Sequence, residues 1–240
     1  MRVKLAHIGA AMALALAAAA PAKAAGPADE AVLAEMNYAR AYPQAYAMRL
    51  VLQPVSPWEQ SLGPAHAAED PQAFAEAVDF LLRQAPLPPL KADERLAASA
   101  LEHVADQGVR GAIGHEGPTG EAFDSRIRRH GVAEPYAAEN IAYGPAQAAD
   151  VVRELIIDSG VPSRGHRRNI FYPPLDAAGV ACGPHRQYAN MCVMDFAGGS
   201  EPARPARLQL AAASPEAPPA APATERSASG GFLSRLLDLF

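Results

Sequence analysis

The sequence has few of the residues and patterns that mark the common functional classes. It contains two cysteines and one tryptophan in 240 residues, and 20% of its residues are charged. This length fits one domain of ordinary size with appendages and argues against two large catalytic domains. No apolar run is long enough for a bilayer span, which excludes a polytopic membrane protein. The net charge of -5, without a dense Lys/Arg stripe, argues against nucleic-acid binding, and we expect no such partner.

The first 25 residues have the pattern of a secretory signal peptide. Arg2 and Lys4 give a basic start, residues 8–20 form a short Ala-rich apolar core, and residues 22–24 form a small-x-small cleavage site. The alternative is an uncleaved anchor. The pattern predicts a cleaved signal over residues 1–25 and a secreted or periplasmic protein, which becomes more acidic because cleavage removes three basic residues and no acid.

The two cysteines lie in a predicted β-hairpin. Residues 178–182 and 190–196 have the composition of short strands, and a turn rich in glycine and polar residues joins them. Two hairpin strands bring such cysteines within bonding distance, and an exported protein meets an oxidising environment. We therefore predict a Cys182–Cys192 disulfide, which restricts the unfolded chain. The alternative is a reactive thiol.

The C-terminal part differs from the rest of the chain. Residues 201–229 are rich in proline, alanine and serine, which is typical of a linker that cannot bury enough apolar surface to fold. Residues 230–240 place their apolar side chains at helical spacing, and this segment is too short to span a membrane. Two interpretations remain open: a peptide that docks to a protein partner or a membrane surface, and a helix that folds back on its own domain.

Residues 26–200 form the predicted globular domain, in which helices precede the strands of the hairpin. This order favours the α+β class over a parallel doubly wound sheet. The strongest helix pattern covers residues 92–107, with Gly108 as its predicted end. Further helices are predicted over residues 28–50 with an interruption at Pro43, 71–82, 122–130 and 146–158.

Familiar catalytic signatures are absent: the sequence has no G-x-S-x-G, H-E-x-x-H, phosphate-binding glycine loop or C-x-x-C. What remains is a set of polar residues in turn-rich contexts, namely His115, Glu139, Asp158 and His166. Two imidazoles and two carboxylates can form a divalent-metal site with open positions. They can also form a hydrogen-bonded cluster in which each carboxylate orients a histidine. Spacing alone leaves both interpretations open.

Neighbouring polar residues are predicted to be structural or solvent-exposed. His103 and His130 fall on polar helical faces and are expected at the surface. The three arginines beside His166 are expected to form a solvated basic turn; they are Arg164, Arg167 and Arg168.

Four motifs occur in an order that resembles a known family. They are PPLKADERLA at residues 88–97, GH at 114–115, AENIAYG at 138–144 and GHRRNI at 165–170. Together they resemble the CAP superfamily, also called the SCP domain family, which includes cysteine-rich secretory proteins, antigen 5 and plant pathogenesis-related proteins. The bacterial branch is the most similar in pattern. Each motif alone is weak, but four in this order are specific, and the resemblance covers about residues 30–198.

The resemblance implies an α-β-α sandwich with a central antiparallel sheet and a cleft lined by two histidines and two acids. By motif position, His115 and His166 match the histidines and Glu139 matches the first acid. Asp158 stands at the second acid, three residues after a leucine where the family has tryptophan, and Glu154 is the alternative. These four positions are the predicted metal ligands, with zinc as the favoured divalent cation.

Three functions are compatible with these features. The favoured one is a secreted binding module whose cleft takes a divalent cation or a small ligand, with a lipid among the candidates. The second is a metal-assisted hydrolase acting on peptide or cell-wall substrates, in which Glu139 is the general base. In the third, the four residues are a polar cluster that shapes the loops. No complete set of nucleophile, base and orienting group is present, which favours binding over catalysis.

Overall fold

The protein is described here by a computed structural model that covers residues 26–53, 55–62 and 69–199. The predicted signal peptide, the linker over 201–229 and the segment over 230–240 lie outside the described residues. Within the described part of the chain, no helix combines the length and apolarity that a membrane crossing requires.

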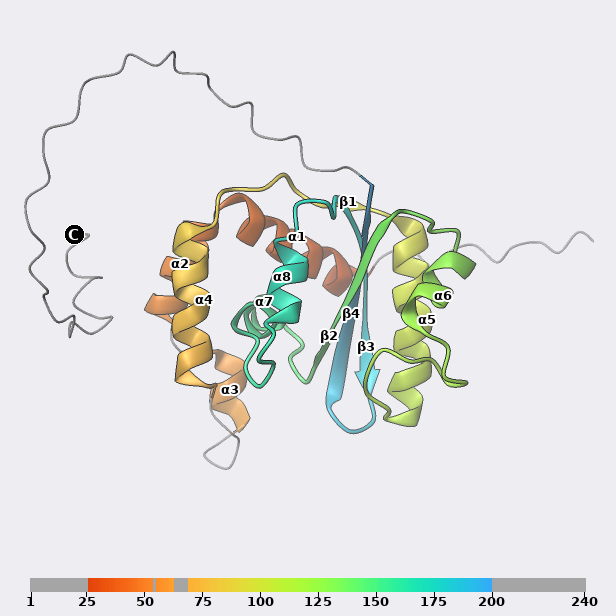
Figure 1. Ribbon diagram of the computed structural model, residues 1–240. Coiled ribbons are helices and arrows are strands. Elements are labelled where there is room, and N and C mark those ends of the chain that lie inside the picture. Colours follow the sequence, from red (N-terminus) through yellow and green to blue (C-terminus); the bar gives the residue numbers. More distant parts are fainter. Residues whose placement is uncertain (1–25, 54, 63–68, 200–240) are drawn as a thin grey trace, which may run out of the picture. The chain divides into compact units, whose positions relative to one another are not determined.

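The first half of the chain is mostly helical, whereas the second half mixes helices with strands and ends in a hairpin (Figure 1). The helices are α1 (Pro27–Ala41), α2 (Pro43–Leu52), α3 (Pro57–Leu62), α4 (Pro71–Arg83), α5 (Glu94–Arg110), α6 (Phe123–Arg129), α7 (Ala148–Ile157) and α8 (Gly165–Ile170). The strands are β1 (Lys91–Ala92), β2 (Tyr136–Tyr143), β3 (Ala177–His185) and β4 (Ala189–Gly198).

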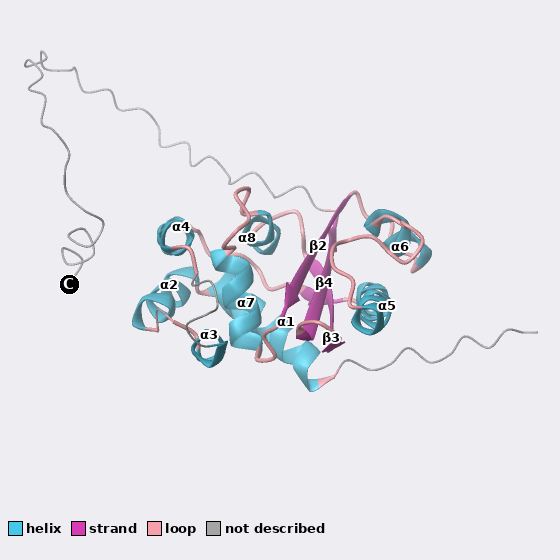
Figure 2. Ribbon diagram, turned by 90° about the horizontal axis from the view of Figure 1, so that it is seen from below, coloured by secondary structure: helices cyan, strands magenta, loops and turns pink. Residues whose placement is uncertain are grey.

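One sheet with the strand order β1-β3-β4-β2 forms the middle layer. The three long strands are antiparallel, and the two-residue β1 adds a short parallel pairing to β3. Figure 2 shows α5 and α6 on one face of the sheet, with α1, α7 and α8 on the other and α2 and α4 further out. The predicted α-β-α sandwich of the α+β class is therefore confirmed, with β1 as the one departure from a purely antiparallel sheet.

The hydrophobic core lies on both faces of the sheet. The larger part joins β3 and β4 to α1, α2, α4 and α7, through side chains such as Met36, Leu155 and Phe196. A smaller part lies under α5. Here α5 packs directly on the backbone of β3, because a Cβ at Gly179 would stand 1.9 Å from the backbone nitrogen of Ala97.

The predicted end of the strongest helix at Gly108 is wrong. The helix begins after Asp93, whose carboxylate accepts hydrogen bonds from the backbone of Arg95, and it continues to Arg110. It ends at Gly111, which has the left-handed φ of 68°. Gly108 serves close packing instead, since a Cβ there would stand 2.4 Å from the carbonyl oxygen of Pro184.

The Cys182–Cys192 disulfide is confirmed. The two cysteines are directly opposite each other in the register of β3 and β4, with their Cα atoms 4.1 Å apart. The hairpin is longer than the sequence pattern indicates, because pairing continues through Pro184 to His185.

Candidate functional site

His115 is held by a buried carboxylate of β2. Its Nδ1 lies 2.8 Å from Oε1 of Glu139, and the loop before it is fixed where the backbone N–H of Gly114 donates to the hydroxyl of Tyr143 at 2.9 Å. The side chain of Glu139 is 1% exposed, whereas that of His115 is 54% exposed. The contact therefore engages Nδ1 and leaves the Nε2 of an accessible imidazole for other partners.

His166 is held in the same way by the acid at the end of α7. Asp158 adopts the left-handed conformation with φ 58° and closes that helix. Its Oδ1 lies 2.7 Å from Nδ1 of His166, and its Oδ2 accepts the backbone N–H of His166 at 2.9 Å. The Asp158 side chain is 1% exposed and the His166 side chain 24%. This double contact favours Asp158 over Glu154 as the second acid.

Consecutive residues of β2 hold the two histidine segments. Glu139 contacts His115, and the side-chain amide of Asn140 donates to the backbone carbonyl of His166 at 3.0 Å. Asn169 donates to the side chain of Asn140 at 2.9 Å and completes the connection to α8. β2 is the edge strand of the sheet, and α6 and α8 lie on its two sides (Figures 1 and 2). Both histidine–carboxylate pairs are thus anchored at one sheet edge.

This geometry is accompanied by a family match over most of the chain. The sequence matches CAP, the cysteine-rich secretory protein family, over residues 33–196. The chain belongs to the CAP family. The bacterial CAP resemblance of the four motifs is confirmed.

Individual relatives cover smaller parts of this CAP protein. It is 35% identical to the uncharacterized protein YkwD of Bacillus subtilis over 95 residues. These residues make up 39% of this chain and 35% of YkwD. The chain thus spans about a third of the length of this curated relative. Among solved structures, an extracellular protein with an SCP domain from Bacillus anthracis is 24% identical over 47% of this chain and 34% of the other, with a TM-score of 0.40. An outer surface protein from Borrelia burgdorferi is 23% identical over 48% of this chain and 80% of the other, with a TM-score of 0.41.

An arginine of the CAP domain is buried behind the pair of His115 and Glu139. Arg126 of α6 forms an ion pair with Oε2 of Glu139, and both side chains are almost fully buried. Arg126 also donates from Nη1 to Nδ1 of His103 at 2.9 Å, so the Nε2 of His103 carries the proton and donates to the carbonyl of Gly114 at 2.9 Å. Burial lowers the pKa of His103. The predicted surface position of His103 is therefore wrong, because this side chain connects Arg126 to the His115 loop.

A second buried acid lies beside Glu139. Asp195 of β4 is directly opposite Glu139 in the strand register, and its Oδ1 lies 3.9 Å from Nη2 of Arg126. Burial, followed by the charge of Glu139, raises the pKa of Asp195 well above its ordinary value. Two buried carboxyl groups thus share one arginine, and holding a proton on Asp195 relieves their repulsion. Sequence reasoning missed Asp195, although a lone acid in an apolar strand was the available signal.

Two of the three arginines beside His166 form specific contacts, whereas Arg168 is exposed. Arg167 is buried and donates to the carbonyls of Ile156 and Ile157 at 2.6 and 3.0 Å, which satisfies the C-terminal end of α7. Arg164 pairs with Glu76 of α4 at 2.7 Å. The prediction of a solvated basic turn is wrong for these two residues, because each stabilises a junction between helices.

The four predicted metal ligands take two different positions at this edge: the two imidazoles present Nε2 as candidate donor atoms, and the two acids hold the imidazoles. Both carboxylates contact Nδ1 atoms, and no group of three or more His, Cys, Asp or Glu side chains gathers into a metal site among the residues that the structure describes. A histidine that donates from Nδ1 to a carboxylate presents Nε2 as the ligand atom, an arrangement common in zinc sites. The chemistry of these two imidazoles suits a cation such as zinc, with water in the remaining positions.

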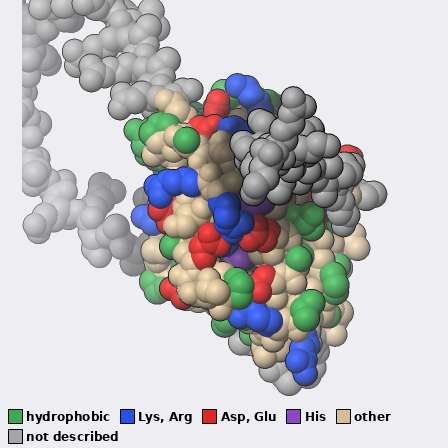
Figure 3. All heavy atoms as spheres, turned by 90° about the vertical axis from the view of Figure 1, so that its right-hand side faces the viewer, with side chains coloured by type: hydrophobic (Ala, Val, Ile, Leu, Met, Phe, Trp, Pro, Cys, Tyr) green, Lys and Arg blue, Asp and Glu red, His purple; other side chains and the backbone are tan. Residues whose placement is uncertain are grey.

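The surface over α5 and α6 carries interleaved charges of both signs (Figure 3). Arg129 bridges Glu102 and Glu121 at 2.8 and 2.7 Å, and His130 pairs with Glu102 at 2.7 Å. These contacts pair the basic side chains at the C-terminal end of α6 with carboxylates of the same surface.

Proposed function

We propose that this CAP domain is an extracellular binding module, which takes a divalent cation or a small ligand between His115 and His166 at the edge of β2. The observation that carries the proposal is the matched pair of contacts. Each Nδ1 meets a buried carboxylate, and each ring retains solvent exposure. Such a carboxylate fixes the orientation of the ring and presents the remaining nitrogen to a ligand.

Zinc is the favoured cation because imidazole suits zinc better than it suits magnesium or calcium. A structural zinc site has four protein ligands. Two imidazoles leave positions for water or for a polar group of a ligand, and such a group includes the head of a lipid. We therefore expect exchangeable rather than structural binding.

The hydrolase alternative receives less support from the geometry. A general base must reach the proton that it abstracts. Glu139 is buried, with one oxygen on His115 and the other on Arg126. This position suits an orienting group better than a base that contacts substrate, which favours binding over hydrolysis.

An extracellular location is supported by the predicted signal over residues 1–25 and by the disulfide. Disulfides persist in oxidising compartments and are rare in the cytosol. The Cys182–Cys192 bond crosses neighbouring strands within the hydrophobic core, where Cys192 is buried. The secreted or periplasmic assignment remains part of this proposal.

Calorimetric titration of the mature chain with Zn²⁺ tests the shared site. We expect one equivalent to bind, and His115→Ala or His166→Ala to abolish the binding. His130→Ala is the matched control, because this histidine pairs with a carboxylate outside the proposed site. Wild-type binding by the double variant His115→Ala/His166→Ala would refute the proposal, and so would full binding by both single variants.

A further inference from the structure

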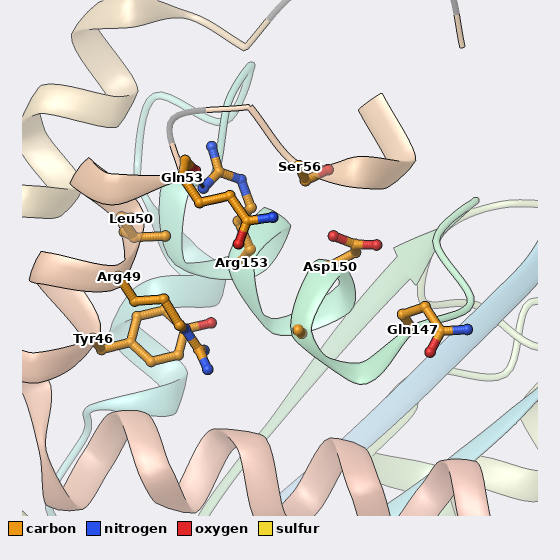
Figure 4. Close-up of a pocket in the computed structure, with 9 residues that line it drawn as sticks. Tyr46, Arg49, Leu50, Gln53, Ser56, Gln147, Asp150 and Arg153 are labelled. Atoms are coloured by element: carbon orange, nitrogen blue, oxygen red, sulfur yellow. Dashed lines mark hydrogen bonds between the residues drawn. The ribbon is translucent and has the colours of Figure 1, made fainter. Parts of the chain in front are cut away.

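The helices α2, α3 and α4 belong to an excursion of the chain that leaves and rejoins the sandwich at one place. The backbone N–H of Leu87 donates to the carbonyl of Arg40 at 2.9 Å, and Asn37 exchanges hydrogen bonds with Leu90. Between α2 and the first turns of α7 is a cavity of about 310 Å³ (Figure 4). Its lining includes neither histidine of the proposed cation site and neither of their carboxylates.

The hydroxyl of Tyr46 is the unusual feature of this cavity. Its oxygen is buried and has no hydrogen-bond partner among the described residues. Figure 4 shows the hydroxyl directed away from α2 toward α7. Burial raises the pKa of Tyr46, so the group stays protonated and can both donate and accept. A buried hydroxyl without a partner is costly, and a ligand hydroxyl in the cavity would satisfy it.

The charges around the cavity are already balanced. Arg49 pairs with Glu35 and lies over the ring of Tyr46, with its guanidinium carbon 4.2 Å from the ring centroid. Arg153 pairs with Glu69 at 2.7 Å. The buried Asp150 is also part of the lining. An anionic ligand would therefore meet no uncompensated positive charge.

We propose that this cavity is a second binding site, which takes a neutral polyhydroxylated ligand of monosaccharide size. Sugar hydroxyls donate and accept at once, and they match the buried hydroxyl of Tyr46 and a lining that includes the side-chain amides of Gln53 and Gln147. The volume lies at the lower end of the roughly 300–1,000 Å³ of ligand pockets, which limits the ligand to a small molecule. This site is independent of the proposed cation site.

Saturation-transfer NMR on the mature chain detects binding of D-glucose, D-galactose and N-acetyl-D-glucosamine. Affinity is then followed by the fluorescence of Trp58, the single tryptophan, which lies two residues after Ser56 and packs against Gly144. We expect saturable binding in the millimolar range. D-glucuronate tests the charge argument, because it differs from glucose by a carboxylate. We expect the protein to bind it at least about tenfold more weakly than D-glucose.

The variant Tyr46→Phe removes only the hydroxyl. We expect it to weaken sugar binding about tenfold, the factor for one hydrogen bond of ordinary strength, and to leave the Tm of the ligand-free protein equal or higher. Tyr42→Phe makes the same change at a side chain of the neighbouring turn that is 60% exposed, and should alter neither quantity. His115→Ala/His166→Ala should bind sugar normally, which separates this site from the cation site.

Three results would overturn the proposal. They are the absence of saturation transfer to all three neutral sugars, tighter binding of glucuronate than of glucose, and unchanged sugar affinity in a folded Tyr46→Phe variant.

Discussion

Among single residues, Arg126 is the cation that compensates two buried carboxyl groups, Glu139 and Asp195. Replacing it with methionine keeps much of the side-chain volume and removes the charge. We expect Arg126→Met to lower the free energy of unfolding by about 3–5 kcal/mol, because a buried carboxylate loses its partner. Urea denaturation measures this change.

Arg128→Met is the matched control on the same helix. Arg128 pairs with Asp124 across one helical turn, and both side chains are more than half exposed. Such exposed pairs contribute about 0–1 kcal/mol. If both variants lose the same free energy of unfolding, the buried pair of Arg126 and Glu139 contributes no more to stability than an exposed pair.

The buried carboxyl of Asp195 predicts a pH dependence of stability. In the unfolded chain it ionises near its ordinary pKa of 3.8, whereas the folded protein holds the proton to higher pH. Above the unfolded pKa the folded state binds more protons, so the free energy of unfolding falls as pH rises. Asp195→Asn cannot ionise and should escape this loss.

Urea denaturation of both proteins at about pH 5 and about pH 8 measures the effect. We expect the stability of Asp195→Asn relative to the wild type to increase with pH. A difference that is constant across this range would contradict the assignment of a raised pKa.

Short motifs in a fixed order led the sequence analysis to two histidines and two acids, and the structure places each acid against one of the histidines. Sequence reasoning missed Arg126 and Asp195, and it placed His103 at the surface. The reason is physical: a charged residue on an amphipathic helix or strand has the same local pattern whether another element covers it or not. Burial of these side chains depends on how α5 and α6 pack over β2 and β4.

At the scale of elements, the contact between α5 and β3 depends on a glycine. A Cβ at Gly179 would clash with backbone atoms of Leu96 and Ala97, which cannot move without displacing the whole helix. We expect Gly179→Ala to lower the free energy of unfolding by about 3 kcal/mol or more, at the upper end of overpacking effects. Thermal and urea denaturation measure the loss.

Gly199→Ala provides the comparison, because a Cβ there would stand 3.6 Å from the ring of Pro135, an ordinary contact. If Gly179→Ala is as stable as Gly199→Ala, the helix does not pack on the strand as closely as described.

The disulfide stabilises the hairpin of β3 and β4 by restricting the unfolded chain. The bond closes a loop of ten residues, and in the chain-entropy account its removal costs about 2–3 kcal/mol. We expect this loss in the double variant Cys182→Ala/Cys192→Ala, measured by urea denaturation against the oxidised wild type. Adding a reductant should then affect only the wild type.

The elements that the sequence predicted are those with a strong local pattern, such as α4, α5 and the hairpin. It did not predict β2 or α8, although both hold site residues. The sequence of β2, YAAENIAY, is short of the β-branched residues that favour strands, and α8 has only six residues. Their structures depend on pairing with β4 and on packing against neighbouring elements, which local pattern does not record.

At the scale of the whole molecule, the sheet edge and the helical excursion are separate regions, and each carries one of the two proposed sites. The edge strand β2 joins two histidine segments that are about 50 residues apart in the chain. The excursion of α2, α3 and α4 adds a cavity against α7 on the other side of the sheet from α5. A variant in one region should therefore leave ligand binding in the other unchanged.

The most direct test of the central claim is a crystal structure of the Zn²⁺-soaked protein with anomalous diffraction recorded at the zinc edge. We expect one zinc peak that lies about 2.0–2.1 Å from Nε2 of His115 and from Nε2 of His166, with Glu139 and Asp158 still on the Nδ1 atoms. Zinc bound separately at each ring, or at neither ring, would contradict a shared site at the edge of β2.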